Sequence, residues 1–200
     1  NYTPNKAARN LSFSKQQIKL GCILFNPEKI EFFQQVMSGL ERKRRELMQY
    51  SVTVDVRFSD FDDPFSQDRI LSEMEADGVD GIALYGINSE STRDIIARLY
   101  AKGIPVVTGN TDIPDSKRIA FVGCDYVQSG RVAGRLIDLC LNGQGTVAVA
   151  QGAHRVLCLE GRLRGVQEYL SAHAPGIQIV DIRRNNQDDF TMFTAVKEIL

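Results

Sequence analysis

The chain is 200 residues long and 43% hydrophobic, which is enough to build one large domain or two smaller lobes. Its 24 basic and 25 acidic residues nearly cancel. This balance excludes a broad polybasic face for nucleic acid or for an anionic membrane, so any DNA contact must come from a local element.

The cysteines and the apolar runs bear on the cellular compartment. Cys22, Cys124, Cys140 and Cys158 form no Cys-x-x-Cys pair, so we expect reduced, buried thiols in a cytosol rather than a disulfide framework. No apolar stretch approaches the roughly 20 residues that a membrane helix needs. Residues 1–17 are too polar to be the core of a signal peptide. The sequence therefore argues against a membrane span and against export.

Short apolar runs rich in β-formers alternate with segments of helical period over the first 122 residues. Strands are expected at 18–25, 52–58, 81–85, 104–108 and 119–122. The first helix is expected from one apolar stripe, made of Ile30, Phe33, Val36, Met37 and Leu40. Two more helices are expected at 67–76 and 89–101, the second closed by Lys102-Gly103.

The same alternation restarts after residue 125. It predicts a helix at 127–140, a strand at 146–150, a helix at 162–172, a strand at 177–182 and a helix from about 188. Strands joined by crossover helices form parallel sheets covered on both faces. The expected fold class is α/β, with two doubly wound parallel-sheet lobes and a ligand cleft between them. Because two strands are too few for a stable lobe, we expect the second lobe to be incomplete.

The motifs of catalysis and metal binding are missing. The sequence contains no GxSxG elbow, no Walker A loop and no GxGxxG between a strand and a helix. His154 and His173 lack neighbours at metal-ligand spacing. The aspartates at 60, 62, 63 and 68 lack the glycine and glutamate of a calcium loop, which favours a solvated, helix-capping loop. We therefore expect a binding protein without catalysis, metal or cofactor.

Polar and aromatic side chains stand where the predicted strands end. Ligands of open parallel sheets bind at these carboxyl ends, and amides, carboxylates and aromatic faces suit a polyhydroxylated ligand. The predicted ligand-binding residues are Asn26, Phe32, Tyr85, Asn110, Asp125, Glu160 and Gln187.

A purely structural role stays open as the alternative at several of these positions. Phe33 fits the apolar stripe of the first helix and is expected to pack in the core, which leaves its neighbour Phe32 as the candidate for stacking on a ligand. Asn110 and Asp125 are also common types of turn residue. Their roles in binding are hypotheses at this stage.

Six segments spread along the chain are similar to a known family. They are NYTPNKAARNL (1–11), the Phe32-Phe33 pair, VDGIALYG (79–86), GIPVVTGN (103–110), FVGCDYVQSGRVAG (121–134) and GRLRGV (161–166). Together they resemble the lactose-repressor/galactose-repressor family and its relatives, the ribose-type periplasmic binding proteins. The resemblance implies a type I periplasmic-binding-protein-like fold, with a hinge or linker at 1–17, an N-terminal lobe at 18–122 and a partial C-terminal lobe at 123–200.

The first of these segments is the most diagnostic. It looks like the family's Tyr-x-Pro-Asn junction followed by a short hinge helix of the form Ala-x-x-Leu, which orders on operator DNA and wedges its leucine into the minor groove. The resemblance implies DNA-hinge roles for Lys6, Ala8, Arg9 and Leu11. It also implies a cytoplasmic homodimer that binds operator DNA with the help of an N-terminal headpiece preceding these residues.

Two departures from the family concern the ligand. Asn110-Thr111 replaces the Asp-Arg of ribose-type proteins, and Glu160 replaces the first arginine of an Arg-x-Arg motif. An ionised carboxylate only accepts hydrogen bonds, so Glu160 suits ligand hydroxyls, an amino group, or a neighbour such as Arg162 or Arg164. Alternatively, Glu160 only favours the positive end of the following helix. We expect a neutral or amino-bearing sugar or polyol other than plain ribose.

The resemblance leaves two roles open. The favoured one is the effector-sensing part of a transcription regulator. The alternative is an exported sugar-binding protein that serves a membrane transporter. The hinge-like segment and the unpaired cysteines favour the regulator, whereas the missing motifs disfavour a third class, an α/β enzyme.

Overall fold

The computed structural model describes residues 17–26, 31–60, 63, 65–152, 156–184 and 189–199, of which 31 and 189 are described by their backbone alone. Five of the predicted functional residues lie outside these ranges. They are the hinge residues Lys6, Ala8, Arg9 and Leu11 and the ligand-binding candidate Gln187.

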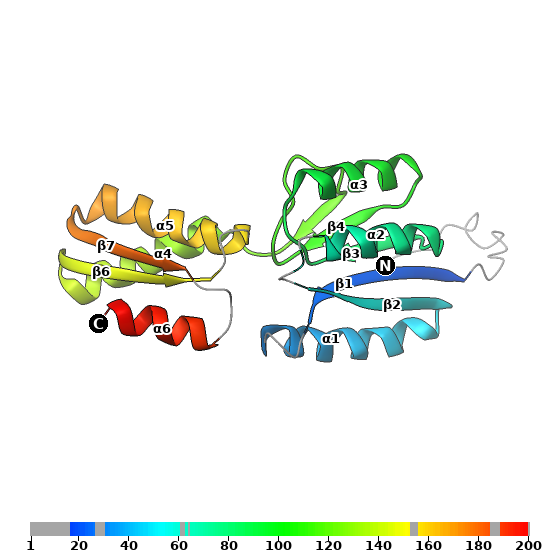
Figure 1. Ribbon diagram of the computed structural model, residues 1–200, viewed down its shortest axis with the longest axis horizontal. Coiled ribbons are helices and arrows are strands. Elements are labelled where there is room, and N and C mark those ends of the chain that lie inside the picture. The colour runs from blue at the N-terminus through cyan, green and yellow to red at the C-terminus, as the bar shows by residue number, and fades with distance from the viewer. Residues whose placement is uncertain are drawn as a thin grey trace, which may run out of the picture.

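The N-terminal lobe is a five-stranded parallel sheet with helices on both faces (Figure 1). Its strands are β1 (Ile18–Phe25), β2 (Val52–Ser59), β3 (Gly81–Leu84), β4 (Val106–Gly109) and β5 (Ala120–Val122), in the order β2-β1-β3-β4-β5. Its helices are α1 (Glu31–Met48), α2 (Ser66–Ala76) and α3 (Glu90–Ala101). The order reverses at β1, which is the kind of switch point where open α/β sheets bind ligands.

The core of this lobe lies in two layers, one on each face of the sheet. Ile23 of β1 packs on the α2 and α3 side with Leu71, Met74, Ile96 and Leu99, all buried. Its neighbours Cys22 and Leu24 point to the α1 side, where Phe33 and Val54 lie. Because successive strand residues alternate between faces, a strand covered on both sides is apolar throughout. This explains the unbroken apolar run that predicted β1.

The C-terminal lobe consists of α4 (Tyr126–Leu141), β6 (Gln144–Gln151), α5 (Leu157–His173), β7 (Gly176–Arg184) and α6 (Asp189–Ile199). β6 and β7 pair in parallel, with a register shift between Val147 and Ala148. Figure 1 shows α4 and α5 packed together on one side of these strands and α6 on the other. The expected α/β class is confirmed.

The crossing of α4 and α5 depends on glycine. A Cβ atom added to Gly130 of α4 would lie 2.0 Å from the carbonyl oxygen of Arg162, and one added to Gly165 of α5 would lie 2.0 Å from that of Val127. The two backbones are therefore in direct contact, a distance that no larger residue permits. This contact fixes the first turns of α5 beside the first turn of α4.

Several boundaries differ from those predicted from the sequence, two of them for a clear reason. Helix α5 starts at Leu157, whereas the sequence predicted 162; this start carries no sequence signal, because the N-cap position, Val156, makes no side-chain cap hydrogen bond. Gly161, which precedes the predicted start, lies inside the helix beside Tyr126. Strand β4 starts at Val106 instead of 104, directly after Pro105, which has no N–H to donate to a sheet.

The cysteines also depart from expectation. All four are free, but only Cys22 and Cys158 are buried, whereas Cys124 and Cys140 are exposed. Burial raises the pKa of the Cys22 thiol to about 11. The expectation of buried thiols is therefore wrong for Cys124, in the connection between β5 and α4, and for Cys140, on the open face of α4. Among the helices in the described ranges, none has the length and apolar character that a bilayer span requires.

We expect Gly165→Ala to lower the free energy of unfolding by about 2–3 kcal/mol, because the new methyl group meets backbone that cannot move aside. Urea unfolding followed by circular dichroism measures this. The matched control is Gly39→Ala in α1, where a Cβ meets nothing within 4 Å, and which should stabilise the helix by roughly 0.5–1 kcal/mol. Equal stability of the two variants would contradict the close crossing.

Candidate ligand-binding site

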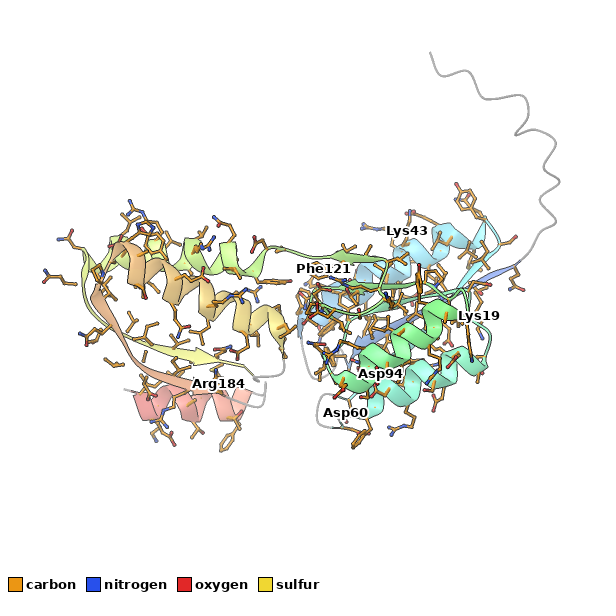
Figure 2. The ribbon with its side chains drawn as sticks, turned by 90° about the horizontal axis from the view of Figure 1, so that it is seen from above. Lys19, Lys43, Asp60, Asp94, Phe121 and Arg184 are labelled. Carbon is orange, nitrogen blue, oxygen red and sulfur yellow. The ribbon has the colours of Figure 1, made fainter. Side chains whose placement is uncertain are left out.

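The carboxyl ends of both sheets face the junction between the two lobes. In Figure 1, β1 and β6 run toward the junction from opposite sides. Figure 2 agrees, since Phe121 and Asp60 lie on the side of the N-terminal lobe that faces the C-terminal lobe, while Lys19, near the start of β1, lies at the far end. The described strand ends that precede the predicted ligand contacts therefore converge on the junction.

An aromatic cluster supports the N-terminal side of the junction. Phe33 is buried at 4% exposure and meets Phe25 and Tyr85 edge-on, at centroid distances of 5.5 and 6.0 Å. Its predicted role in the core is confirmed. Phe32 is 49% exposed and leans edge-on against Phe33 at 5.1 Å, so much of its ring is open to a ligand.

The Tyr85 ring extends this cluster toward β4. A Cβ added to Gly109 would lie 2.8 Å from the ring, so the ring lies flush against the backbone that precedes Asn110. Burial raises the pKa of Tyr85, which keeps its hydroxyl protonated and able to donate. Asn26, at the end of β1, is half-buried and engaged with another group. The structure therefore gathers Phe32, Tyr85 and Asn110 through ring and backbone contacts.

Asn110 joins the two lobes. It follows β4 in the left-handed region, with a φ of 59° that asparagine tolerates better than most residues. Its Oδ1 accepts a hydrogen bond of 2.8 Å from the hydroxyl of Tyr126, the first residue of α4. The guanidinium carbon of Arg162, from α5, lies 4.4 Å from the centre of the Tyr126 ring. Tyr126 lies in the family-like segment 121–134 but is not one of the predicted ligand-binding residues.

A second polar cluster lies at the end of β6. Gln151 is 7% exposed, and its Nε2 donates to Glu160 Oε1 at 3.0 Å. Arg184, at the end of β7, donates to the same oxygen at 3.4 Å. Within the described residues, Gln151 Oε1 has no hydrogen-bond partner although it is buried. Such an unpaired acceptor is costly unless a ligand or water satisfies it.

Glu160 pairs with a more distant arginine than Arg162 or Arg164, the neighbours that the sequence offered as one of its options. Arg162 stacks on Tyr126, and Arg164 pairs with Glu168 at 3.8 Å. Residues two apart on a helix do not face each other, and Arg164 turns instead to the residue one turn further along. The actual partner, Arg184, is 24 residues away in sequence, so no local spacing signals it.

Asp125 has a structural role that the sequence had left as an alternative. It is the N-cap of α4, and its Oδ1 accepts from the backbone N–H of Gln128 at 2.9 Å. Its side chain is exposed. The contact with a ligand that the sequence predicts stays a prediction.

A polar cavity of about 180 Å³ lies beside the aromatic cluster, at the ends of β1, β2 and β3. Gln67, a buried polar residue of its lining, is fully engaged, since Nε2 donates to Ile87 O and Thr92 Oγ1 while Oε1 accepts from Ile87 N. Asp63 accepts from the Phe65 N–H at the start of α2 and pairs with Arg69. The N-cap position of α2, Phe65, has no side-chain cap hydrogen bond, so the helix-capping role expected of the aspartates is not seen among the described residues. Among the described residues, no group of three His, Cys, Asp or Glu is placed to hold a metal ion.

The family follows from comparison with known proteins. The sequence model of the family described as "Periplasmic binding protein domain" matches residues 22–200 of this chain. The chain belongs to this family. Among curated proteins, none matches the chain.

Solved solute- and sugar-binding proteins share the fold. A solute-binding protein of an ABC transporter from Burkholderia graminis, solved with D-arabinose, is 26% identical with a TM-score of 0.79, over 91% of this chain and 61% of its own. A glucose-galactose binding protein from Geobacillus stearothermophilus is 26% identical with a TM-score of 0.74, over 92% of this chain and 65% of its own. This chain thus spans less than two thirds of either protein.

A regulator shares the fold as well. A putative LacI transcriptional regulator from Bacteroides fragilis is 19% identical with a TM-score of 0.78, over 92% of this chain and 66% of its own. At this identity, the likeness shows the fold alone.

We expect Asp125→Ala to cost roughly 1 kcal/mol of stability through the lost helix cap, whereas Asp125→Asn should keep most of it because asparagine also caps helices. Thermal unfolding of both variants measures this. Asp125→Asn also separates capping from binding, since it keeps the cap and removes the charge. Equal losses in the two variants would contradict the capping role.

Proposed function

We propose that the chain is the effector-binding part of a DNA-binding transcription regulator, and that it binds a small neutral or amino-bearing sugar or polyol at the junction of its lobes. The convergence of Asn110, Tyr126 and Arg162 from both lobes is the observation that carries the binding role. As proposed, the ligand binds without chemical change, and no cofactor takes part.

The chemistry of the junction supports a polyhydroxylated ligand. Asn110 and Arg162 offer N–H donors, Gln151 offers an unpaired acceptor, and Phe32 offers an open ring that suits the C–H face of a sugar. Glu160 already receives hydrogen bonds from Gln151 and Arg184. A ligand hydroxyl or ammonium group is compatible with its charge, whereas a phosphate or carboxylate is repelled.

The regulatory role is supported by the sequence of Asn1 to Leu11, which resembles the family's DNA hinge and lies outside the described residues. A regulator of this kind works in the cytoplasm as a homodimer, since a pair of hinge helices reads a palindromic site.

The second candidate role is that of an exported solute-binding protein. The two 26%-identical structures favour it, because both are named as solute- or sugar-binding proteins. The encoded residues upstream of Asn1 discriminate between the roles. A helix-turn-helix there supports the regulator, and an apolar signal sequence supports the transporter partner.

We expect neutral sugars and amino sugars, and not sugar acids or sugar phosphates, to raise the melting temperature in a thermal-shift screen. A ligand at 100 times its Kd should add about 2.7 kcal/mol of stability. The screen is repeated on Glu160→Gln, which should change the ranking because the carboxylate is lost. Stabilisation mainly by acidic or phosphorylated compounds, or the same profile for both proteins, would remove Glu160 from the site.

We expect residues 1–200 alone to bind DNA weakly and without sequence preference, because their net charge is −1 and no headpiece holds the hinge. A mobility-shift titration on random and palindromic duplexes measures this. Tight, sequence-specific binding by these residues alone would show that the proposed division between hinge and headpiece is wrong.

A further inference from the structure

Tyr126 lies where the two lobes meet and contacts both. It is the first residue of α4, directly after the 123–125 connection from β5. Its hydroxyl donates to Asn110 of the N-terminal lobe, and its ring lies under Arg162 of the C-terminal lobe. A single side chain thus holds two candidate ligand contacts that come from different lobes.

The contact between the Tyr126 ring and Arg162 is fixed by close packing of α4 against α5. A Cβ added to Gly161 would lie 3.1 Å from the Tyr126 Cβ, so the backbone of α5 passes directly beside the tyrosine. The glycine contacts between α4 and α5 hold that backbone in place. Arg162, one residue further along, therefore lies over the ring face, where a cation is attracted by the π-electrons.

The Tyr126 hydroxyl sets the orientation of the Asn110 amide. The backbone of Asn110 is held by a hydrogen bond of 2.9 Å from its N–H to Val122 O, and its φ lies in the left-handed region. Since Oδ1 accepts from Tyr126, the Nδ2 group is the part of the amide left to donate elsewhere. Asn110 Nδ2 and the Arg162 guanidinium then form a pair of donor groups on either side of one tyrosine.

We propose that Tyr126 is a positioning residue that couples the lobes, orienting the Asn110 amide through its hydroxyl and the Arg162 guanidinium through its ring. The assignment of a ligand to these two donors rests on the proposed function. The coupling between the lobes does not. A rotation of α4 relative to β4 that separates Tyr126 from Asn110 breaks or lengthens their hydrogen bond. The bond therefore opposes such a rotation in the absence of ligand.

The test compares Tyr126→Phe with Tyr169→Phe. Tyr126→Phe removes the hydroxyl and keeps the ring under Arg162. Tyr169→Phe is the matched control, because its hydroxyl bonds to Arg135 and Asp138 inside the C-terminal lobe and touches no residue of the other lobe in the described contacts. Small-angle X-ray scattering of the ligand-free proteins measures the distribution of interlobe distances. Calorimetry with D-arabinose, D-glucose and myo-inositol measures the affinity for each sugar.

We expect Tyr126→Phe to broaden the distribution of interlobe distances and to weaken binding of the sugar that binds the parent protein by about tenfold. Tyr169→Phe should change neither. Parent-like scattering for Tyr126→Phe would overturn the coupling. Altered scattering with no sugar bound by any of the proteins would support the coupling and count against the proposed function. Altered scattering with unchanged affinity would overturn the positioning of ligand contacts by Tyr126.

Discussion

The direct backbone contact between α4 and α5 is the constraint on which the junction depends. Gly130 and Gly165 let the two helices approach until each glycine meets a carbonyl oxygen of the other helix. Dispersion forces fall steeply with distance, so such an approach also gives strong packing. It brings Tyr126, at the start of α4, beside Arg162 of α5. Glu160, in the same turn of α5, reaches Gln151 at the end of β6. Larger residues at the crossing would separate these groups.

The candidate ligand contacts of the N-terminal lobe are supported by ring and backbone contacts within that lobe. Phe33 anchors Phe32 and Tyr85, and Tyr85 lies against the backbone leading to Asn110. Two buried atoms near the junction, Thr111 Oγ1 and Gln151 Oε1, have no hydrogen-bond partner within the described residues. Folding alone gains nothing from leaving such groups unsatisfied. Their positions, next to Asn110 and Glu160, agree with a site whose polar requirements are completed by something bound.

Local pattern predicted the fold and the residue types of the site, but not the contacts between them. Strand β1 was predicted at its observed bounds, and the apolar stripe separated buried Phe33 from open Phe32. The start of α5 was missed because its N-cap position, Val156, is not a capping residue type, and Gly161 inside the helix is required by its close neighbour Tyr126, which the sequence does not reveal. The Arg184–Glu160 and Tyr126–Asn110 contacts were missed because they join residues 24 and 16 positions apart, and that pairing is set by the sheet register and the lobe crossing.

The register shift in the second sheet accommodates one extra residue of β7 without disturbing the pairing beside the site. Before the shift Val147 pairs with Ile179, and after it Ala148 pairs with Asp181, so Val180 is one extra residue in β7. Paired residues of neighbouring strands point to the same face, so Arg184 shares the face of its partner Gln151 and Arg183 that of Ala150. Arg184 reaches Glu160 of α5 from one face, and Arg183 reaches Glu198 of α6 from the other. In evolutionary terms, loss of the codon for Val180 would leave both pairings as they are, so β7 tolerates a change of length at this point without a change in the charge beside the site.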